Sequence, residues 1–285
     1  MPEQPRPQGR AWLPPLTLLA VTAVYGWTFV VIKAVLAEYP VLPYLGLRFG
    51  IAVVVLFLLL RRRPARESWK VGLPVGAVLA VGYLFQTEGM VSIKPGIAGL
   101  LTGLFVVFTP ILDRVVFGTR LRLRTGVSVL VALGGTYLLT GAGGHFSGGD
   151  LLVVASALAF AAQIVLLSRR RDSPVELGVV QMAVCAVAFL CLGTTSGVPY
   201  PPVTGAVALA LLITGVLASA LAILAQTWAQ QRMSASRAGV LLAAEPVLAL
   251  GFAVVLTNET LTSLQLVGAG LVMVAILGHE IAFKR

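Results

Sequence analysis

The stretch "QTEGMVSIKPGIAGLL" at residues 86–101 has a counterpart in "QTWAQQRMSASRAGVL" at residues 226–241. The positions that agree keep one constant separation along the chain, and the agreement continues into the residues that follow both stretches. The matched pairs are Gln86 with Gln226, Thr87 with Thr227, Ala98 with Ala238, Gly99 with Gly239, Val115 with Val255 and Leu121 with Leu261. A constant separation indicates an internal duplication, because chance matches between apolar segments would scatter.

The composition indicates which solvent surrounds the chain. Hydrophobic residues make up 58% of the 285 residues and charged residues only 11%, whereas a soluble domain carries about a quarter charged residues. Such a chain suits the lipid bilayer, where the backbone must satisfy its own hydrogen bonds in helices or closed barrels. The apolar runs are about twenty residues long and do not alternate with polar residues, which predicts helices.

The apolar runs predict an all-α integral membrane protein with ten transmembrane helices. The expected spans are residues 13–36, 41–60, 71–91, 96–117, 123–142, 150–168, 175–195, 204–230, 237–256 and 261–282. The first five spans form one repeat, residues 13–142, and the last five form a second repeat, residues 150–282. Residues 1–12 and 283–285 are expected to be cytoplasmic tails.

The basic residues are sorted by side of the membrane. With the N-terminus in the cytoplasm, 18 of the 21 Lys and Arg fall inside, Lys94 falls outside, and Lys33 and Arg48 lie within spans. This distribution follows the positive-inside rule. The net charge of +10 is therefore a topology signal and does not indicate a nucleic-acid partner. We expect a multi-pass protein of the cell's inner membrane with both termini in the cytoplasm.

Five helices per repeat mean that the second copy enters the membrane from the opposite side. The two halves are then related by a two-fold axis in the membrane plane. Inverted repeats are a usual construction of secondary transporters, and their solute site lies near the midplane between the halves. The sequence therefore predicts two inverted five-helix repeats around a central cavity.

Four stretches together resemble the drug/metabolite transporter superfamily, specifically its ten-helix EamA family with the YddG-like exporters. They are "YGWTFVVIK" at 25–33, "PYLGLRF" at 43–49, "AGLLTGLFVVFTPIL" at 98–112 and "SASRAGVLLAAEPVLALGFAVVLTNETL" at 234–261. Their order and spacing carry the resemblance over essentially the whole chain. In two departures, Trp and Gly in "YGWT" reverse the commoner order, and Thr119 stands where an acid is often found, whereas Glu259 keeps the acid in the second half.

The resemblance implies a bundle that alternates access to a central cavity and moves small solutes, commonly outward. It also implies that the first, third, fourth, sixth, eighth and ninth helices line this cavity. We expect the protein to act as a monomer, with a small-molecule substrate and the lipid bilayer as its partners and with protons as a candidate coupling ion.

One carboxylate lies in the strongly apolar stretch "LLAAEPVLAL" at 241–250. Glu245 falls about 12 Å into its helix at about 1.5 Å per residue, close to the midplane. Pro246 removes a backbone donor and obstructs the carbonyl of Leu242, so a kink is expected there, and Pro110 is expected to kink the fourth helix. Because ionisable residues in lipid suggest function, Glu245 is a candidate site for a substrate amine or a proton. The alternative is a structural carboxylate that bonds a neighbouring helix.

Three further charges fall within spans, at similar depth toward the outside. An ion pair of Glu88 with Arg48 or with Lys33 would neutralise both partners and serve as an outer gate or a helix-pairing contact. The alternative is that each side chain extends toward the lipid headgroups.

Polar and aromatic residues on the helices that the resemblance assigns to the cavity complete the candidate substrate site. They are Trp27, Tyr83, Gln86, Phe160, Gln163, Gln226, Trp228 and Glu245. The amides could bind the polar ends of a solute, and the aromatic rings could stack on a flat or cationic one. The alternatives are hydrogen bonds between helices for the amides and packing for the rings.

The sequence offers no pattern for catalysis, a metal or another cofactor. No His, Cys and Asp cluster has metal-ligand spacing, and no glycine loop precedes Lys and Ser or Thr in the pattern of a nucleotide site. Asp113 and Asp150 lie at span ends, as do His145 and His279, so an intramembrane protease is disfavoured. The preferred interpretation is a secondary transporter that exports small metabolites, including aromatic or neutral amino acids. The alternatives are an ion-independent facilitator and a multidrug or cation efflux protein.

Overall fold

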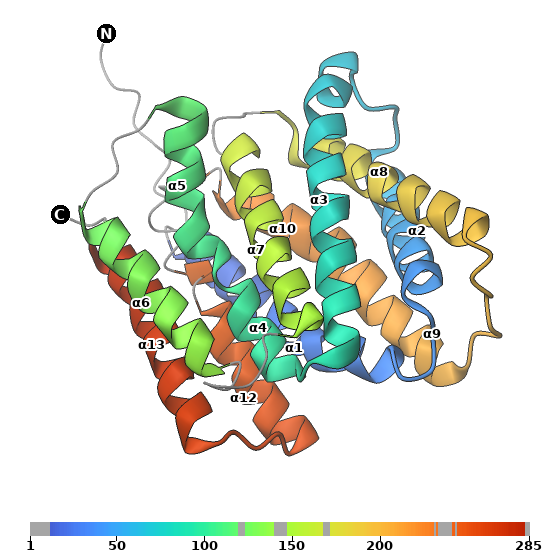
Figure 1. The fold of residues 1–285 in the computed structure, drawn as a ribbon. Helices are drawn as coiled ribbons and strands as arrows, with labels where there is room; N and C mark the ends of the chain where they lie inside the picture. Colours follow the sequence, from blue (N-terminus) through green and yellow to red (C-terminus); the bar gives the residue numbers. More distant parts are fainter. Residues whose placement is uncertain are drawn as a thin grey trace, which may run out of the picture.

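A computed structural model describes residues 12–118, 123–139, 147–167, 172–230, 232, 241–242 and 244–282. All regular structure in these ranges is helical, and the helices pack side by side in one bundle (Figure 1). The helical bundle confirms the predicted fold class. The predicted tails, apart from Trp12 at the end of the first, lie outside the described residues.

The helices follow the predicted spans closely wherever the chain is described. Their bounds are α1 (Leu13–Val35), α2 (Val41–Leu60), α3 (Arg66–Ser92), α4 (Pro95–Thr102), α5 (Phe105–Phe117), α6 (Leu123–Leu139), α7 (Gly148–Leu167), α8 (Pro174–Thr195), α9 (Gly205–Leu211), the π-helix η1 (Leu212–Leu221), α10 (Ala222–Gln230), α12 (Glu245–Thr257) and α13 (Ser263–Ala282). The fourth span is divided into α4 and α5, and the eighth into α9, η1 and α10. The third helix begins earlier than predicted, at Arg66, because "RESWK" continues the helix beyond its apolar part.

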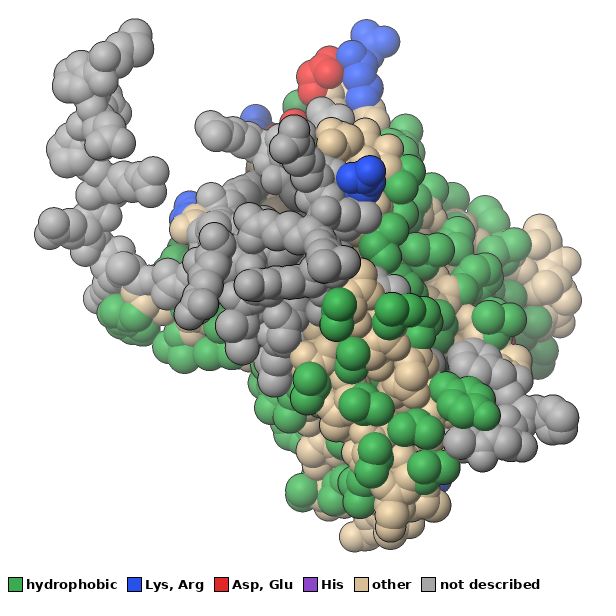
Figure 2. Space-filling view, turned by 60° about the vertical axis from the view of Figure 1, so that its left-hand side comes forward, with side chains coloured by type: hydrophobic (Ala, Val, Ile, Leu, Met, Phe, Trp, Pro, Cys, Tyr) green, Lys and Arg blue, Asp and Glu red, His purple; other side chains and the backbone are tan. Residues whose placement is uncertain are grey.

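The surface of the bundle suits lipid rather than water. Seven of the described segments are both long and apolar enough to cross a membrane, and the segments Glu245–Thr257 of α12 and Ser263–Ala275 of α13 are apolar as well. Large hydrophobic side chains face outward, for example Val115 at 76%, Leu130 at 70% and Val255 at 75% exposure. In Figure 2 hydrophobic side chains cover much of the described surface, and most of the visible charges gather toward the upper end. Polar side chains such as Gln86 and Thr214 are buried instead.

The packing of the helices shows the two-fold relation between the halves. Three contacts join equivalent helices of the two repeats: α2 with α8, α6 with α13, and α4 with α12. The contact of α3 with α7 has its counterpart in the contact of α1 with α10. The main contacts therefore run across the repeats, and neither half builds its own separate core.

Both repeats interrupt a helix at the same position. In the first repeat α4 ends at Thr102, α5 begins at Phe105, and the N–H of Leu104 donates to the carbonyl of Leu101 at 3.2 Å. The second repeat has the equivalent bond at the positions that the duplication matches to these two, from the N–H of Ala244 to the carbonyl of Leu241, again at 3.2 Å. These tight turns replace the regular helical hydrogen bonds in the middle of two spans.

The breaks lie close to the two prolines at which the sequence predicts kinks. Pro246 is the second residue of α12, so the helix restarts beside it, and its missing N–H is one that a first turn leaves unbonded in any case. Pro110 lies inside α5, and the break in that span precedes it at Gly103–Leu104. The prolines lie next to the breaks or beyond them, and the tight turns themselves are common to both halves.

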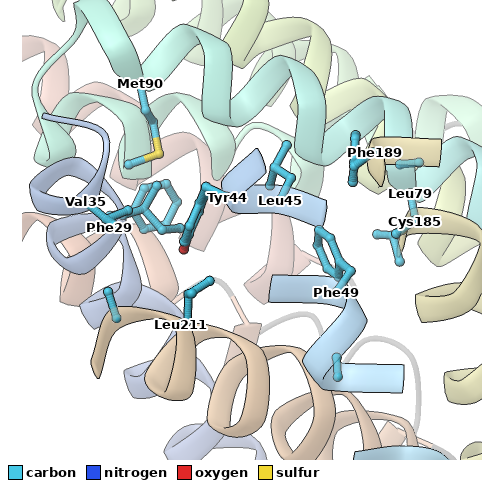
Figure 3. Close-up of a cluster of buried hydrophobic side chains, with 14 of the residues drawn as sticks. Phe29, Val35, Tyr44, Leu45, Phe49, Leu79, Met90, Cys185, Phe189 and Leu211 are labelled. Atoms are coloured by element: carbon cyan, nitrogen blue, oxygen red, sulfur yellow. The ribbon is translucent and has the colours of Figure 1, made fainter. Parts of the chain in front are cut away.

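The larger buried hydrophobic cluster surrounds α2 and includes residues of α1, α3, α4, α8 and α9. Figure 3 shows Tyr44, Leu45 and Phe49 of α2 in this cluster with Phe29 of α1 and Phe189 of α8. The ring centroids of Phe49 and Phe189 are 5.7 Å apart. This cluster fixes α2 against the second half and thereby positions the one arginine that α2 carries inward, Arg48.

We predict that Gly72→Ala destabilises the bundle and that Gly50→Ala does not. A Cβ atom at Gly72 would lie 2.5 Å from Cγ1 of Val180 on α8, whereas a Cβ atom at Gly50 would meet nothing within 4 Å. Overpacking of this kind costs about 1–3 kcal/mol, and alanine is the better helix former where space is free. Melting temperatures of the two variants in detergent provide the measurement, and equal melting temperatures would contradict the prediction.

Candidate functional site

A cavity of about 90 Å³ lies between the two repeats. Its lining residues are Tyr25, Thr28, Phe29, Ile32, Arg48, Leu79, Tyr83, Gln86, Thr102, Phe105, Phe160, Gln163, Ile164, Ile223, Gln226, Leu242 and Glu245. One water needs about 10–15 Å³ of such space, so several waters fit beside the polar groups. The six helices that the resemblance implied all contribute to the lining, and α2 adds Arg48.

The wall of the cavity repeats with the duplication. Four pairs of lining residues keep the same separation as the matched sequence stretches: Tyr83 with Ile223, Gln86 with Gln226, Thr102 with Leu242, and Phe105 with Glu245. Three more pairs, from α1 and α7, share a slightly shorter constant separation: Tyr25 with Phe160, Thr28 with Gln163, and Phe29 with Ile164. The cavity therefore lies on the two-fold axis, where equivalent helix faces of the two repeats meet.

The breaks in the two helices open onto this cavity. Thr102 and Phe105 flank the first break, Leu242 and Glu245 flank the second, and all four line the cavity. Interrupted membrane helices of transporters commonly lie at their solute and ion sites.

Glu245 is the only carboxylic acid among the described lining residues. It is 9% exposed and forms no hydrogen bond or ion pair with the described part of the chain. It is the first residue of α12 and lies at the N-terminal end of that helix. The geometry leaves the carboxylate available to a cation in the cavity.

Arg48 is the only cation among the described lining residues. Its Nε donates to the Ser219 hydroxyl at 2.9 Å, and its Cζ lies 5.1 Å from the ring centroids of both Phe49 and Tyr83. Ser219 belongs to the π-helix η1, and wide turns of this kind recur at functional sites. The arginine is 3% exposed, and its Nη1 has no hydrogen-bond partner in the described ranges.

Two glutamines of the cavity wall also form hydrogen bonds between helices. Gln86 Nε2 donates to the Thr102 hydroxyl at 3.1 Å, and Gln163 Nε2 donates to Gln181 Oε1 at 3.2 Å. Both bonds join different helices, which is the alternative role that the sequence analysis gave these amides. Both amides also line the cavity. They therefore combine a structural bond with a surface that faces a solute.

Aromatic rings form one side of the site. The Tyr83 ring lies edge-on to Phe160 with centroids 5.3 Å apart, and 4.8 Å from the centroid of Phe49. Six of the eight predicted substrate-site residues line the cavity: Tyr83, Gln86, Phe160, Gln163, Gln226 and Glu245.

The structure places the other two predicted residues, Trp27 and Trp228, outside the lining. Trp228 is two positions from Gln226, about 200° around an α-helix, and Arg232 lies over its ring at 4.4 Å. Trp27 is similarly turned away, because the lining positions of α1 are Tyr25, Thr28, Phe29 and Ile32. These positions follow Tyr25 by three, four and seven residues, the spacing of one helix face. The sequence-based prediction chose Trp27 for its large ring and did not use this spacing.

The expected ion pairs of Glu88 do not form. Lys33 Nζ instead donates to the carbonyls of Met90 and Val91, each at 2.8 Å. Those carbonyls belong to the last turn of α3 and have no partner within the helix, so the lysine caps the helix end. Arg48 bonds Ser219 as described, and half-buried Glu88 makes no ion pair with either cation. Lys33 and Arg48 do pair helices, but through carbonyls and a hydroxyl.

Glu259 was noted in the sequence only as a loop acid, but it connects the two halves at one end of the bundle. Its Oε2 accepts the N–H of Gly96 in the first turn of α4 at 3.0 Å, and nearby Lys94 Nζ donates to the carbonyl of Thr260 at 3.0 Å. Burial raises the pKa of the Glu259 carboxyl, and the N–H of Gly96 and the charge of Lys94 oppose this shift. The carboxylate caps α4 as Lys33 caps α3.

Glu176 performs the same role at the opposite end of α3 and was absent from the sequence-based candidates. Its carboxylate accepts Arg62 Nη2 at 2.7 Å, the N–H of Ala65 at 3.1 Å and the Ser68 hydroxyl at 2.6 Å. The acid comes from α8 in the second half, and its partners surround the start of α3 in the first. Its position in the first turn of a helix after "DSP" gave no indication of this partner.

Comparison with known proteins identifies the same duplication. The EamA-like transporter family matches the chain twice, at residues 12–141 and 147–279. A crystal structure of a protein 22% identical in sequence has a TM-score of 0.66 and covers 94% of this chain and 97% of its own. The family match confirms the resemblance and the repeat, and the crystal structure shows that the fold is shared.

The curated relatives are also transporters by name. An uncharacterized transporter of Archaeoglobus fulgidus is 33% identical over 269 residues, covering 92% of this chain and 84% of its own. The uncharacterized transporter YoaV of Bacillus subtilis is 24% identical, covering 95% and 97% of the two chains. The uncharacterized inner membrane transporter YedA of Escherichia coli is 27% identical, covering 91% and 88%.

We predict that a double-mutant cycle between Lys33 and Glu88 gives additive effects, with an interaction energy below about 0.5 kcal/mol. Lys33→Met should lower the unfolding temperature in detergent because it uncaps α3, and the size of that effect should not depend on Glu88→Gln. An interaction energy of about 1 kcal/mol or more between the two substitutions would show that the ion pair forms after all.

Proposed function

The chain belongs to the EamA-like transporter family, and from that premise we propose that it exports small amine-bearing metabolites, such as aromatic or neutral amino acids, by alternating access. The observation that carries the proposal is Glu245, a carboxylate without a partner in the described chain, at a helix break in a cavity on the two-fold axis. A substrate ammonium group supplies the charge that this carboxylate lacks. The rings of Tyr83 and Phe160 supply a surface for an apolar or aromatic side chain.

Alternating access requires contacts that hold one end closed and can be exchanged. The caps that Lys33 and Glu259 form join α1 to α3 and the second half to α4 at one end of the bundle. The network around Glu176 joins the halves at the opposite end. In the proposed cycle these contacts break and form in turn as the cavity opens to one side and then the other.

Coupling to protons follows from the same carboxylate. Glu245 binds either a proton or the ammonium group of the substrate, so the two compete for one site. A proton gradient directed inward would then drive export, because proton entry and amine exit alternate at Glu245. The proposed setting is the inner membrane, with both termini in the cytoplasm as the distribution of Lys and Arg favours.

We predict that Glu245→Gln abolishes gradient-driven transport. The purified protein in proteoliposomes is given labelled neutral amino acids and organic cations, with and without a pH gradient. Losing a charged hydrogen bond to the substrate costs about 1.5–3 kcal/mol, or roughly tenfold or more in affinity. The matched control is Glu38→Gln, the same substitution at an exposed residue outside the spans, which should transport as the wild type does.

The outcomes separate the candidate mechanisms. Transport that the gradient stimulates in the wild type and not in Glu245→Gln supports a proton-coupled exporter. Transport of the same solutes that neither the gradient nor the substitution alters identifies an ion-independent facilitator and assigns Glu245 a structural role. Preference for organic cations over all amino acids identifies cation efflux.

A further inference from the structure

Arg48 has a positive charge for which the described lining of the cavity supplies no direct partner. The guanidinium cannot lose its proton in a protein, and it has five N–H donors. One donor bonds the neutral hydroxyl of Ser219, while Nη1 is buried without a hydrogen bond to the described residues. A buried and unsatisfied charged donor costs free energy, so its persistence beside a cavity points to a ligand that completes it.

The surroundings hold the guanidinium in place without neutralising it. The rings of Phe49 and Tyr83 lie 5.1 Å from its Cζ and attract it through their faces. The only carboxylate in the described lining, Glu245, forms no ion pair with it. A guanidinium and a carboxyl group therefore line one small cavity without forming an ion pair with each other.

We propose that Arg48 binds the carboxylate of the transported solute, so that the solute is a zwitterion with its ammonium group at Glu245. This inference rests on the proposed function and narrows its substrate class. A guanidinium presents paired N–H donors that match the two oxygens of a carboxylate. Binding a zwitterion satisfies both buried charges and leaves the occupied site with no net charge.

The same arrangement disfavours ligands with one charge. An amine without a carboxylate pairs with Glu245 but leaves Arg48 unsatisfied and adds a second cation to the cavity. An anion without an ammonium group pairs with Arg48 but leaves Glu245 without a cation and adds a second negative charge to the cavity. Tyr25 and Tyr83 also line the cavity, so their side chains are available to contact the body of the solute.

The symmetry of the wall supports a dedicated role for Arg48. Most lining residues belong to pairs related by the duplication, but Arg48 comes from α2, and α8, the equivalent helix, contributes none of the described lining residues. The arginine is thus an addition to the symmetric wall, held there by Ser219 of η1. A residue needed only to join the repeats would gain nothing from a charge at the cavity wall.

The experiment compares solutes that differ only in their charged groups. Full-length protein in proteoliposomes is given phenylalanine and leucine, each beside its carboxamide and its decarboxylated amine. The wild type should favour each amino acid over its amide and amine by about tenfold or more. Arg48→Met should lose that preference by lowering the affinity for the amino acids while leaving the affinity for the amines unchanged or higher.

Two further variants guard against a folding defect. Arg63→Met makes the same substitution at an exposed residue in the loop after α2 and should keep the wild-type preference. Ser219→Ala removes the bond to Nε, leaves the charge in place, and should reduce the preference in part. Melting temperatures of all variants are measured alongside, and if Arg48→Met does not fold, the wild-type solute series and Ser219→Ala decide the question.

The outcomes distinguish this inference from the proposed function. If the wild type transports the amines and amides as well as the amino acids, or if Arg48→Met keeps the wild-type preference, the carboxylate site is disproved while amine export stands. If the wild type transports none of these solutes, the proposed function fails, and the assignment of Arg48 fails with it.

Discussion

The structure depends on one constraint: inside a bilayer, each backbone polar group and each charge must find its partner within the protein. The bundle meets it by facing apolar side chains outward and placing its polar side chains where helices meet. Helix ends are the hardest case, since four N–H or C=O groups there have no partner in the helix. Lys33, Glu176 and Glu259 each cap such an end, and each cap joins two separate segments.

The same constraint explains where the helices break. At the two breaks, at Gly103–Leu104 and before Glu245, tight turns supply the backbone hydrogen bonds, and residues that flank both breaks line the cavity between the repeats. The two breaks are equivalent because of the duplication. Since both lie close to the two-fold axis, one cavity borders both of them. The cavity lies where the two interrupted helices meet across that axis, through the contact of α4 with α12.

The sequence predicted the features that depend on composition and periodicity. The ten spans, the duplication and Glu245 all follow from apolar length, from a constant separation of matched residues and from the cost of a charge in lipid. It did not predict the partners of Lys33 and Glu176, because both bind helix ends that lie far away in the sequence. Opposite charges suggested an ion pair of Glu88 with Lys33. The lysine instead binds carbonyl groups at the end of α3, and the side chains alone do not show that these carbonyls lack a partner.

The charged residues of the cavity wall have no charged counterparts at the positions that the duplication pairs with them. In an inverted repeat, the two halves can exchange conformations, so that a site on the axis is presented first to one side and then to the other. Tyr25 with Phe160 and Gln86 with Gln226 preserve that equivalence. Glu245 has Phe105 as its counterpart, and Arg48 has no lining counterpart among the described residues of α8. The paired positions suit such an exchange, and under the proposed function Glu245 and Arg48 would hold the solute in one orientation.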